Sequence, residues 1–262
     1  MTRGPVGGWP AAIDAVLLDA GGVLLDLDYR YLRRLISTRL APAAGLRVTE
    51  RGLAAHEALA RQEIHRQVLE GGRSSAAWRD YFHSILGRAG VHEEHREGLI
   101  DALWEAHQRV GLWTVAVERG PRTVRELKRR GYRLAVVSNA EGNVARDLDA
   151  AGYRGAFGAV IDSHIVGLEK PDPAIFALAL ERIGVSADRA IFVGDVPAID
   201  VAGARAAGIA PVLLDRHDAF PDVDAPRISV LEELLSRLPG TGEAPGDRAD
   251  DPAAEPAQNN QA

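Results

Sequence analysis

The sequence predicts an α/β protein in which a doubly wound parallel sheet is interrupted by an inserted helical block. Short apolar runs rich in Leu, Ile and Val alternate with helical stretches, which is typical of strands covered on both faces. A long helical segment separates the first run from the second. Polar and charged residues directly follow several runs, at the carboxyl ends of strands where such sheets bind ligands.

Strands and helices alternate through most of the chain. The predicted strands are Ala15–Leu18, Leu134–Val137, Ala159–Ile161, Ala190–Val193 and Pro211–Leu214. The predicted helices of this part are Arg122–Arg130, Asn143–Ala151, Pro173–Ile183, Val201–Ala207 and Val230–Leu238. A glycine directly follows most of them, where a left-handed residue often ends a helix. This alternation indicates a parallel sheet with helices on both faces.

The segment between the first and second strands has only helical patterns. We predict helices at Tyr29–Leu40, Thr49–Glu70, Ser75–Ala89 and Glu93–Val110. Residues 28–113 are therefore expected to form a cap domain, inserted into a core made of residues 13–27 and 114–238. Residues 1–12 are expected to be flexible, and residues 239–262, rich in Pro, Gly, Ala and acids, to be a disordered tail.

Composition narrows the classes of partner. The 262-residue chain carries a formal net charge of -6, which argues against nucleic acid or an anionic membrane surface. It contains no cysteine, which excludes disulfides and thiolate zinc sites. The N-terminus lacks the apolar run of a secretory signal, and no apolar stretch has membrane-spanning length. We expect a cytoplasmic monomer or homodimer that acts on a small molecule.

Candidate catalytic residues stand at the ends of the predicted strands. Asp19 follows the first strand, Ser138 and Asn139 follow the second, and Asp195 follows the fourth. The carboxyl ends of parallel strands meet at one edge of the sheet, so we expect these side chains to converge. A single Asp after a strand is usually a turn residue, but several polar residues at one edge indicate a site.

Two further residues complete this set. Lys170, one of two lysines in the chain, lies in the loop after the third strand, and Asp200 begins the helix after Asp195. Asp19 can attack phosphorus as a nucleophile, and with Asp195 and Asp200 it can hold Mg²⁺. Lys170 can neutralise charge on the nucleophile and the phosphate.

The transferring phosphoryl group also needs hydrogen-bond donors. Ser138, Asn139 and the backbone N–H groups of Gly21 and Gly22 are the candidates for binding its oxygens. The sequence therefore predicts Mg²⁺-dependent phosphoryl transfer.

These motifs together resemble those of the haloacid dehalogenase-like hydrolase superfamily. The matching segments are Asp19-Ala-Gly-Gly-Val, Val136-Val-Ser-Asn, Lys170-Pro-Asp and Gly194-Asp-Val-Pro-Ala-Ile-Asp200. The resemblance covers roughly residues 13–238, and the helical block falls where one subgroup carries its cap. It implies a Rossmann-like core with strand order 3-2-1-4-5 and Mg²⁺-dependent hydrolysis through an aspartyl intermediate on Asp19.

The sequence departs from the family at Gly21. Family phosphatases usually carry a second Asp there, as general acid and base, while the metal contact at that position is a backbone carbonyl. Glycine therefore keeps the metal contact and loses the proton shuttle. The first motif, with Asp26 and Asp28 at matching offsets, is similar to that of sugar-1-phosphate phosphatases that also lack this Asp. Asp26 and Asp28 either replace the acid or form the turn into the cap.

A phosphatase of small phosphorylated metabolites is the function we expect, and two alternatives stay open. One is a catalytically weak regulatory or binding protein, which would explain Gly21. The other is a 2-haloacid dehalogenase, although dehalogenases typically lose the Gly-Asp of the fourth motif that this chain keeps. Phosphonoacetaldehyde hydrolysis is disfavoured, because it needs a cap lysine and residues 28–113 contain none.

The cap gives little information about the substrate. Its histidines are expected on solvated helix faces, and these are His56, His65, His83, His92, His95 and His107. Its aromatic residues are expected to form the core of the cap, and these are Trp78, Tyr81, Phe82 and Trp104.

Overall fold

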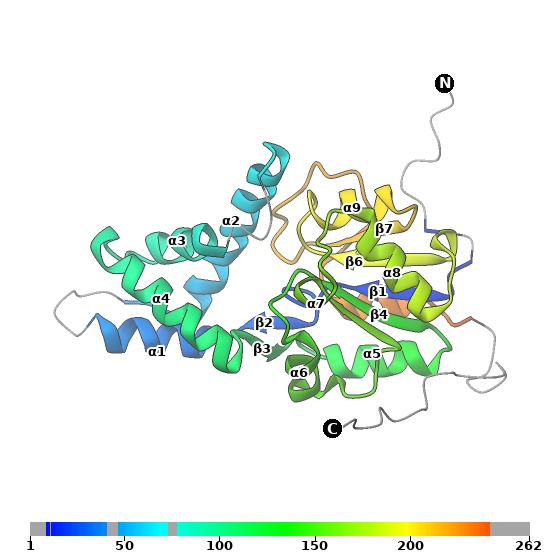
Figure 1. Cartoon of the computed structure of the whole chain (residues 1–262), viewed down its shortest axis with the longest axis horizontal. Helices are drawn as coiled ribbons and strands as arrows, with labels where there is room; N and C mark the ends of the chain where they lie inside the picture. Colours follow the sequence, from blue (N-terminus) through cyan, green and yellow to red (C-terminus); the bar gives the residue numbers. More distant parts are fainter. Residues whose placement is uncertain (1–8, 11, 41–46, 73–77, 242–262) are drawn as a thin grey trace, which may run out of the picture.

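A six-stranded parallel sheet is the centre of the structure (Figure 1), a computed structural model that describes residues 9–10, 12–40, 47–72 and 78–241. The strands run in the order β5-β4-β1-β6-β7-β8. Their bounds are β1 Ala15–Leu18, β4 Arg133–Ser138, β5 Ala159–Asp162, β6 Ala190–Gly194, β7 Ala210–Leu214 and β8 Arg227–Ile228. Apart from β8, a short edge strand that the sequence analysis missed, this is the expected order 3-2-1-4-5.

Helices cover both faces of the sheet, because successive strand residues point to opposite sides. Val16 and Leu18 of β1 share a hydrophobic cluster with residues of α5 and α6. Ala15 and Leu17 instead share one with residues of α8 and α9. The bounds of these helices are α5 Gly120–Arg129, α6 Val144–Leu148, α8 Pro173–Ile183 and α9 Asp200–Ala206.

Shorter elements complete this part of the chain. They are a π-helical turn at Asp149–Tyr153, α7 Ser163–Val166, 3-10 turns at Ala187–Arg189 and Leu231–Glu233, and α10 Leu234–Arg237. The predicted helix over 143–151 is thus a short α-helix continued by the π turn, and the one over 230–238 is divided into a 3-10 turn and α10.

Four helices form a separate block beside the sheet, at the left of Figure 1. They are α1 Tyr29–Arg39, α2 Glu50–Leu69, α3 Trp78–Arg88 and α4 Glu93–Val110, and we call them the cap. Asp28 and Thr49 begin α1 and α2 by accepting hydrogen bonds from backbone N–H groups of the first turn. Leu53, Phe82 and Leu103 belong to a hydrophobic cluster made mainly of cap residues.

Two short antiparallel strands connect the cap to the sheet. They are β2 Leu25–Leu27, which precedes the cap, and β3 Trp113–Ala116, which follows it. They lie between cap and sheet in Figure 1. At three and four residues they are too short for their alternation to be recognised in the sequence. Within the described ranges, no helix is long and apolar enough to cross a membrane.

Candidate active site

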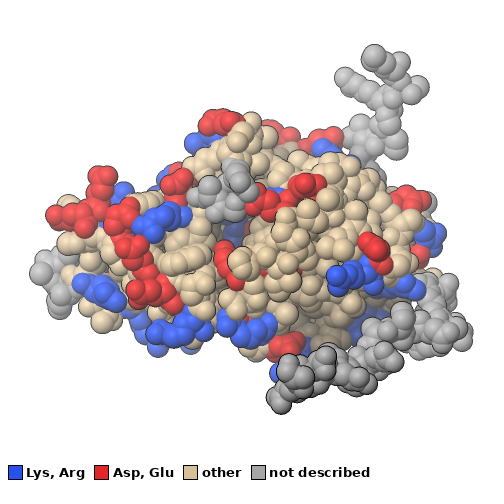
Figure 2. All heavy atoms as spheres, in the orientation of Figure 1, with Lys and Arg blue, Asp and Glu red and all other residues tan. Residues whose placement is uncertain are grey.

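A cavity of about 850 Å³ lies between the carboxyl edge of the sheet and the cap. Asp19, Ser138, Lys170, Asp195 and Asp200 all line it. The sequence places these residues after four different strands, and the fold brings them to one cavity. Figure 2 shows both acidic and basic side chains on the surface of the cap.

Lys170 connects two of the carboxylates. Its Nζ lies 2.9 Å from Asp19 Oδ1 and 2.8 Å from Asp200 Oδ1, and the residue is only 1% exposed. Burial lowers the pKa of Lys170, but the two carboxylates raise it more, so the ammonium group stays charged. The N–H of Ala20 also donates to Asp19 Oδ1, at 2.7 Å. Oδ2 of Asp19 is therefore the oxygen available to act as a nucleophile.

Asp200 connects the Lys170 side chain to the loop that follows β6. Besides the contact with Lys170, its Oδ2 accepts hydrogen bonds of 2.9 Å from the backbone N–H groups of Asp195 and Val196. A Cβ atom on Gly194 would lie 2.3 Å from the Cβ of Asp200, so this close approach requires glycine. Both oxygens of Asp200 are thus engaged by the protein. Its contacts indicate a positioning role, while direct metal coordination stays a prediction.

Asn139 has a positioning role as well. Its side-chain Nδ2 donates to the carbonyl oxygen of Lys170 at 2.9 Å, and its Oδ1 accepts from the Lys170 N–H at 2.8 Å. These two bonds fix the loop that carries the lysine. Asn139 also lines the cavity, so its expected contact with substrate stays a prediction. Ser138, 4% exposed at the end of β4, lines the cavity as expected of a phosphate-binding hydroxyl.

The two glycines after the nucleophile differ in their roles. The Gly22 N–H donates to the carbonyl oxygen of Leu25 at 2.8 Å, and Gly22 is not among the residues that line the main cavity. The prediction that this N–H binds phosphate is therefore corrected. Gly22 has φ +76°, and a Cβ there would lie 2.0 Å from Asp195 Oδ2, so the turn requires glycine. Gly21 does line the cavity, beside Trp113.

The carboxylates form a site whose chemistry fits a hard cation. Asp19, Asp195 and Asp200 can each offer an oxygen such that these atoms lie within 4.8 Å of one another. Burial raises the pKa of Asp195 to about 7; Arg61 opposes this shift, and the other two carboxylates add to it. Within the described part of the chain, the buried Oδ2 of Asp195 accepts no hydrogen bond. An all-oxygen set that includes a buried carboxylate oxygen without a hydrogen bond suits Mg²⁺.

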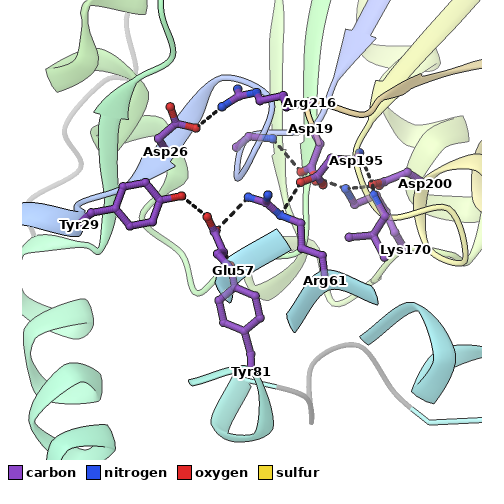
Figure 3. Close-up of polar contacts among 12 residues, drawn as sticks. Asp19, Asp26, Tyr29, Glu57, Arg61, Tyr81, Lys170, Asp195, Asp200 and Arg216 are labelled. Atoms are coloured by element: carbon purple, nitrogen blue, oxygen red, sulfur yellow. Dashed lines mark hydrogen bonds and ion pairs between the residues drawn. The ribbon is translucent and has the colours of Figure 1, made fainter. Parts of the chain in front are cut away.

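Arg61 is a cap residue of the site that the sequence analysis missed. Its Nε lies 2.8 Å from Asp195 Oδ2, an ion pair without hydrogen-bond alignment, and its Nη2 donates to Glu57 Oε1 at 2.8 Å. Glu57 is buried and also accepts from the hydroxyls of Tyr29 and Tyr81 (Figure 3). The sequence showed only the i,i+4 spacing of Glu57 and Arg61, because the contact with Asp195 crosses from cap to core.

The two acids near the cap entrance do not replace the missing Asp. Asp26 pairs with Arg216 at 2.6 Å, away from the carboxylate cluster in Figure 3. Asp28 caps α1 by accepting from the Tyr31 N–H at 2.8 Å. Neither is among the residues that line the cavity. Of the two possibilities that the sequence left open, the contacts of both residues therefore favour a structural role at the turn into the cap.

One expected surface histidine is buried. His107 is only 6% exposed, lines the cavity, and its Nε2 lies 2.7 Å from Glu141 Oε2. It is thus not on a solvated face as expected, because the cavity and the surrounding aromatic rings enclose that face of α4. Trp78 and Trp104 also line the cavity, in addition to their contacts within the cap.

The comparisons with known proteins agree with this geometry. Residues 13–208 match the sequence profile of the family described as haloacid dehalogenase-like hydrolase. Phosphoserine phosphatase from Thermus thermophilus is 36% identical over 161 residues, which are 59% of this chain and 62% of that protein. Haloacid dehalogenase-like hydrolase domain-containing protein 3 from Mus musculus is 31% identical over 166 residues, 62% of this chain and 66% of that one.

These matched segments span less than two thirds of either relative's own length. Among solved structures, a dehalogenase superposes with a TM-score of 0.59 at 22% identity, covering 87% of this chain and 98% of the dehalogenase. That likeness concerns the fold.

Proposed function

Because the chain belongs to the haloacid dehalogenase-like hydrolase family, we propose that this hydrolase is a Mg²⁺-dependent phosphatase of small phosphorylated metabolites. The observation that carries this proposal is the carboxylate cluster around the nucleophile. Asp195 is buried beside Asp19 and Asp200, with one oxygen that accepts no hydrogen bond in the described part of the chain. Such an all-oxygen cluster beside Lys170 and Arg61 suits Mg²⁺, whereas halide displacement from a haloacid by a carboxylate needs no metal.

The reaction begins at Asp19. Its Oδ2 attacks phosphorus, the bond from phosphorus to the leaving oxygen breaks, and the electron pair goes to that oxygen. Water then attacks the aspartyl phosphate, the electron pair returns to Asp19, and the water releases a proton. The net reaction converts a phosphate ester and water into an alcohol and phosphate.

The surrounding side chains stabilise this charge transfer. Lys170 balances the charge of Asp19 and of the phosphoryl group, and Asn139 and Asp200 hold it in place. The hydroxyl of Ser138 binds a phosphoryl oxygen. Asp19, Asp195 and the Gly21 carbonyl, with Asp200 behind them, would hold Mg²⁺, which supplies positive charge that offsets the negative charge of nucleophile and phosphate.

The relatives support hydrolysis of phosphate esters. The Thermus thermophilus relative is a phosphoserine phosphatase, and its similarity covers 59% of this chain. Relatives of this family also include a dehalogenase, (S)-2-haloacid dehalogenase 4A from Burkholderia cepacia, at 30% identity over 151 residues. The buried carboxylates around Asp195 favour the phosphatase.

One assay tests the proposal directly. Phosphate release is measured from a panel of phosphorylated metabolites with Mg²⁺ and with a chelator, beside the Asp19→Asn variant. We expect release that needs both Mg²⁺ and Asp19. Halide release from 2-haloacids in the presence of the chelator, without phosphate release from any ester, would show a dehalogenase instead.

A further inference from the structure

We infer that the cavity selects phosphate esters whose leaving group is an aromatic ring. This inference names the substrate class of the proposed phosphatase and rests on that function. It is carried by the aromatic part of the cavity lining, which we call the wall and which consists of rings contributed by the cap and by β3.

The wall contains five rings from three elements. They are Trp78 and Tyr81 of α3, Trp104 and His107 of α4, and Trp113 of β3. The ring centroids of Trp78 and Trp104 are 5.0 Å apart, those of His107 and Trp113 are 5.7 Å apart, and those of Tyr81 and Trp113 are 5.9 Å apart. The ring centroids of Trp104 and His107, 6.0 Å apart, link these pairs. The spacings are those of packed aromatic pairs, so the five rings form one connected group.

Part of this group is exposed to the cavity rather than used to fill the cap. Trp104, which lines the cavity, remains 40% exposed despite its size, whereas Phe82, which like Trp104 packs against Trp78, is fully buried. A large apolar side chain left open at the wall of a deep cavity is a common feature of ligand sites. The cap thus presents ring surface toward the place where a substrate lies.

The aromatic wall begins beside the reacting atoms. A Cβ atom on Gly21 would lie 3.5 Å from Trp113 Cδ1, and Gly21 is two residues after the nucleophile. A leaving group that departs past Gly21 therefore meets the ring of Trp113 and not a carboxylic acid. When the leaving group is a phenoxide, its ring stabilises the negative charge that the breaking bond leaves on oxygen. Such a group can depart without a proton donor. An ordinary alkoxide needs that proton in the transition state.

Two of the polar side chains that line the cavity are already engaged within the protein. Glu141 is engaged with His107, and Ser163 exchanges hydrogen bonds with the backbone of Ala140. Within the described residues, Trp78 Nε1 and His107 Nδ1 are buried and have no hydrogen-bond partner, so these two rings present mainly carbon to the cavity. A sugar would have to give up the water bound to several hydroxyl groups when it packs against these rings. A flat aromatic ring carries few such groups and therefore gives up little bound water.

The test separates ring recognition from leaving-group reactivity. Phenyl phosphate and 2-naphthyl phosphate have leaving groups of similar acidity and different ring area, acetyl phosphate has a good leaving group without a ring, and glucose 1-phosphate carries a sugar. We expect kcat/KM to fall in the order naphthyl, phenyl, then acetyl and glucose esters. In Trp104→Leu the preference for naphthyl over acetyl phosphate should fall about 2- to 12-fold, mainly through KM.

Trp9→Leu is the matched control, because Trp9 packs against Arg237 and is not among the cavity-lining residues. It should keep the wild-type preference. Binding of 2-naphthyl phosphate to Asp19→Asn, measured by calorimetry with and without Trp104→Leu, gives a readout that needs no turnover.

Two failures are distinguishable. If acetyl phosphate or glucose 1-phosphate is hydrolysed most efficiently and Trp104→Leu leaves the preference unchanged, the inference about aromatic leaving groups is wrong and the phosphatase stands. If no phosphate ester is hydrolysed at all, the proposed function fails, and the calorimetry alone decides whether the wall binds aromatic rings.

Discussion

Replacing Gly21 with Asp should restore the proton transfer that the wild-type site lacks. The added carboxyl group would protonate the leaving oxygen and then deprotonate the hydrolytic water. General acid–base catalysis of this kind contributes about 10²- to 10⁴-fold. We therefore expect Gly21→Asp to raise the steady-state rate on alkyl phosphates by about 100-fold or more, and on aryl phosphates by less.

The structure can accept this side chain. The nearest atoms to a Cβ on Gly21 belong to Trp113, at 3.5 and 3.6 Å, which is ordinary van der Waals contact. Gly21 is not among the described residues with positive φ. The Gly21→Asn variant adds a side chain of the same shape as Asp but without its charge. Its free energy of unfolding should differ from that of the wild type by no more than about 1 kcal/mol.

Rapid-mixing kinetics with an aryl phosphate and Mg²⁺ provide the assay. The wild type should release a burst of the phenol followed by a slower steady state, because breakdown of the aspartyl phosphate lacks a base. Gly21→Asp should shrink the burst and raise the steady state, and Gly21→Asn should do neither. The reasoning is refuted if Gly21→Asn accelerates turnover as much as Gly21→Asp. It is also refuted if the wild type shows no burst and hydrolyses alkyl and aryl esters equally fast.

Three other perturbations test the site and its support. Asp195→Asn should weaken Mg²⁺ binding at least about tenfold in calorimetry, because a carboxylate ligand is lost; unchanged affinity would refute the metal assignment. Lys170→Arg should lower kcat at least about tenfold, roughly 1.4 kcal/mol of barrier, because a planar guanidinium does not fit between two buried carboxylates; near-normal kcat would refute this. Burial lowers the pKa of His65 below 6.5, and its Nδ1 accepts a hydrogen bond from the Ala198 N–H at 3.0 Å. The contribution of neutral His65 to the free energy of unfolding is complete above pH 6.5 and is lost as the pH falls through the lower folded-state pKa. Urea unfolding between about pH 7.5 and 5 should therefore show a larger loss of stability in the wild type than in His65→Gln. An equal loss in both proteins would show that His65 is not responsible.

Much of the fold follows from local patterns. Runs such as Ala15–Leu18 and Ala190–Val193 are buried on both faces, and this leaves an unbroken apolar signal in the sequence. The family and the strand order expected from the motifs are confirmed. The strands β2, β3 and β8 were not predicted, because segments of two to four residues are too short to show a periodic pattern of apolar residues.

The site was predicted where its residues follow strands or lie in the loop or helix that comes next. Asp19, Ser138 and Asp195 follow or end their strands, so topology alone brings them together. Arg61 belongs to a helix of the cap, and only packing between cap and core determines that it meets Asp195. The burial of His107 depends in the same way on aromatic rings from other elements, which no pattern within α4 indicates.

The pairing of β2 with β3 determines how the cap can move. Both crossings of the chain between sheet and cap run through this single ribbon, since Leu25 pairs with Ala116 and Asp26 with Val115. A rigid rotation of the cap relative to the sheet would therefore bend this ribbon. Arg61 lies on the cap and Asp195 on the core, so such a rotation lengthens their ion pair. Such a rotation would withdraw the positive charge of Arg61 from the carboxylate of Asp195.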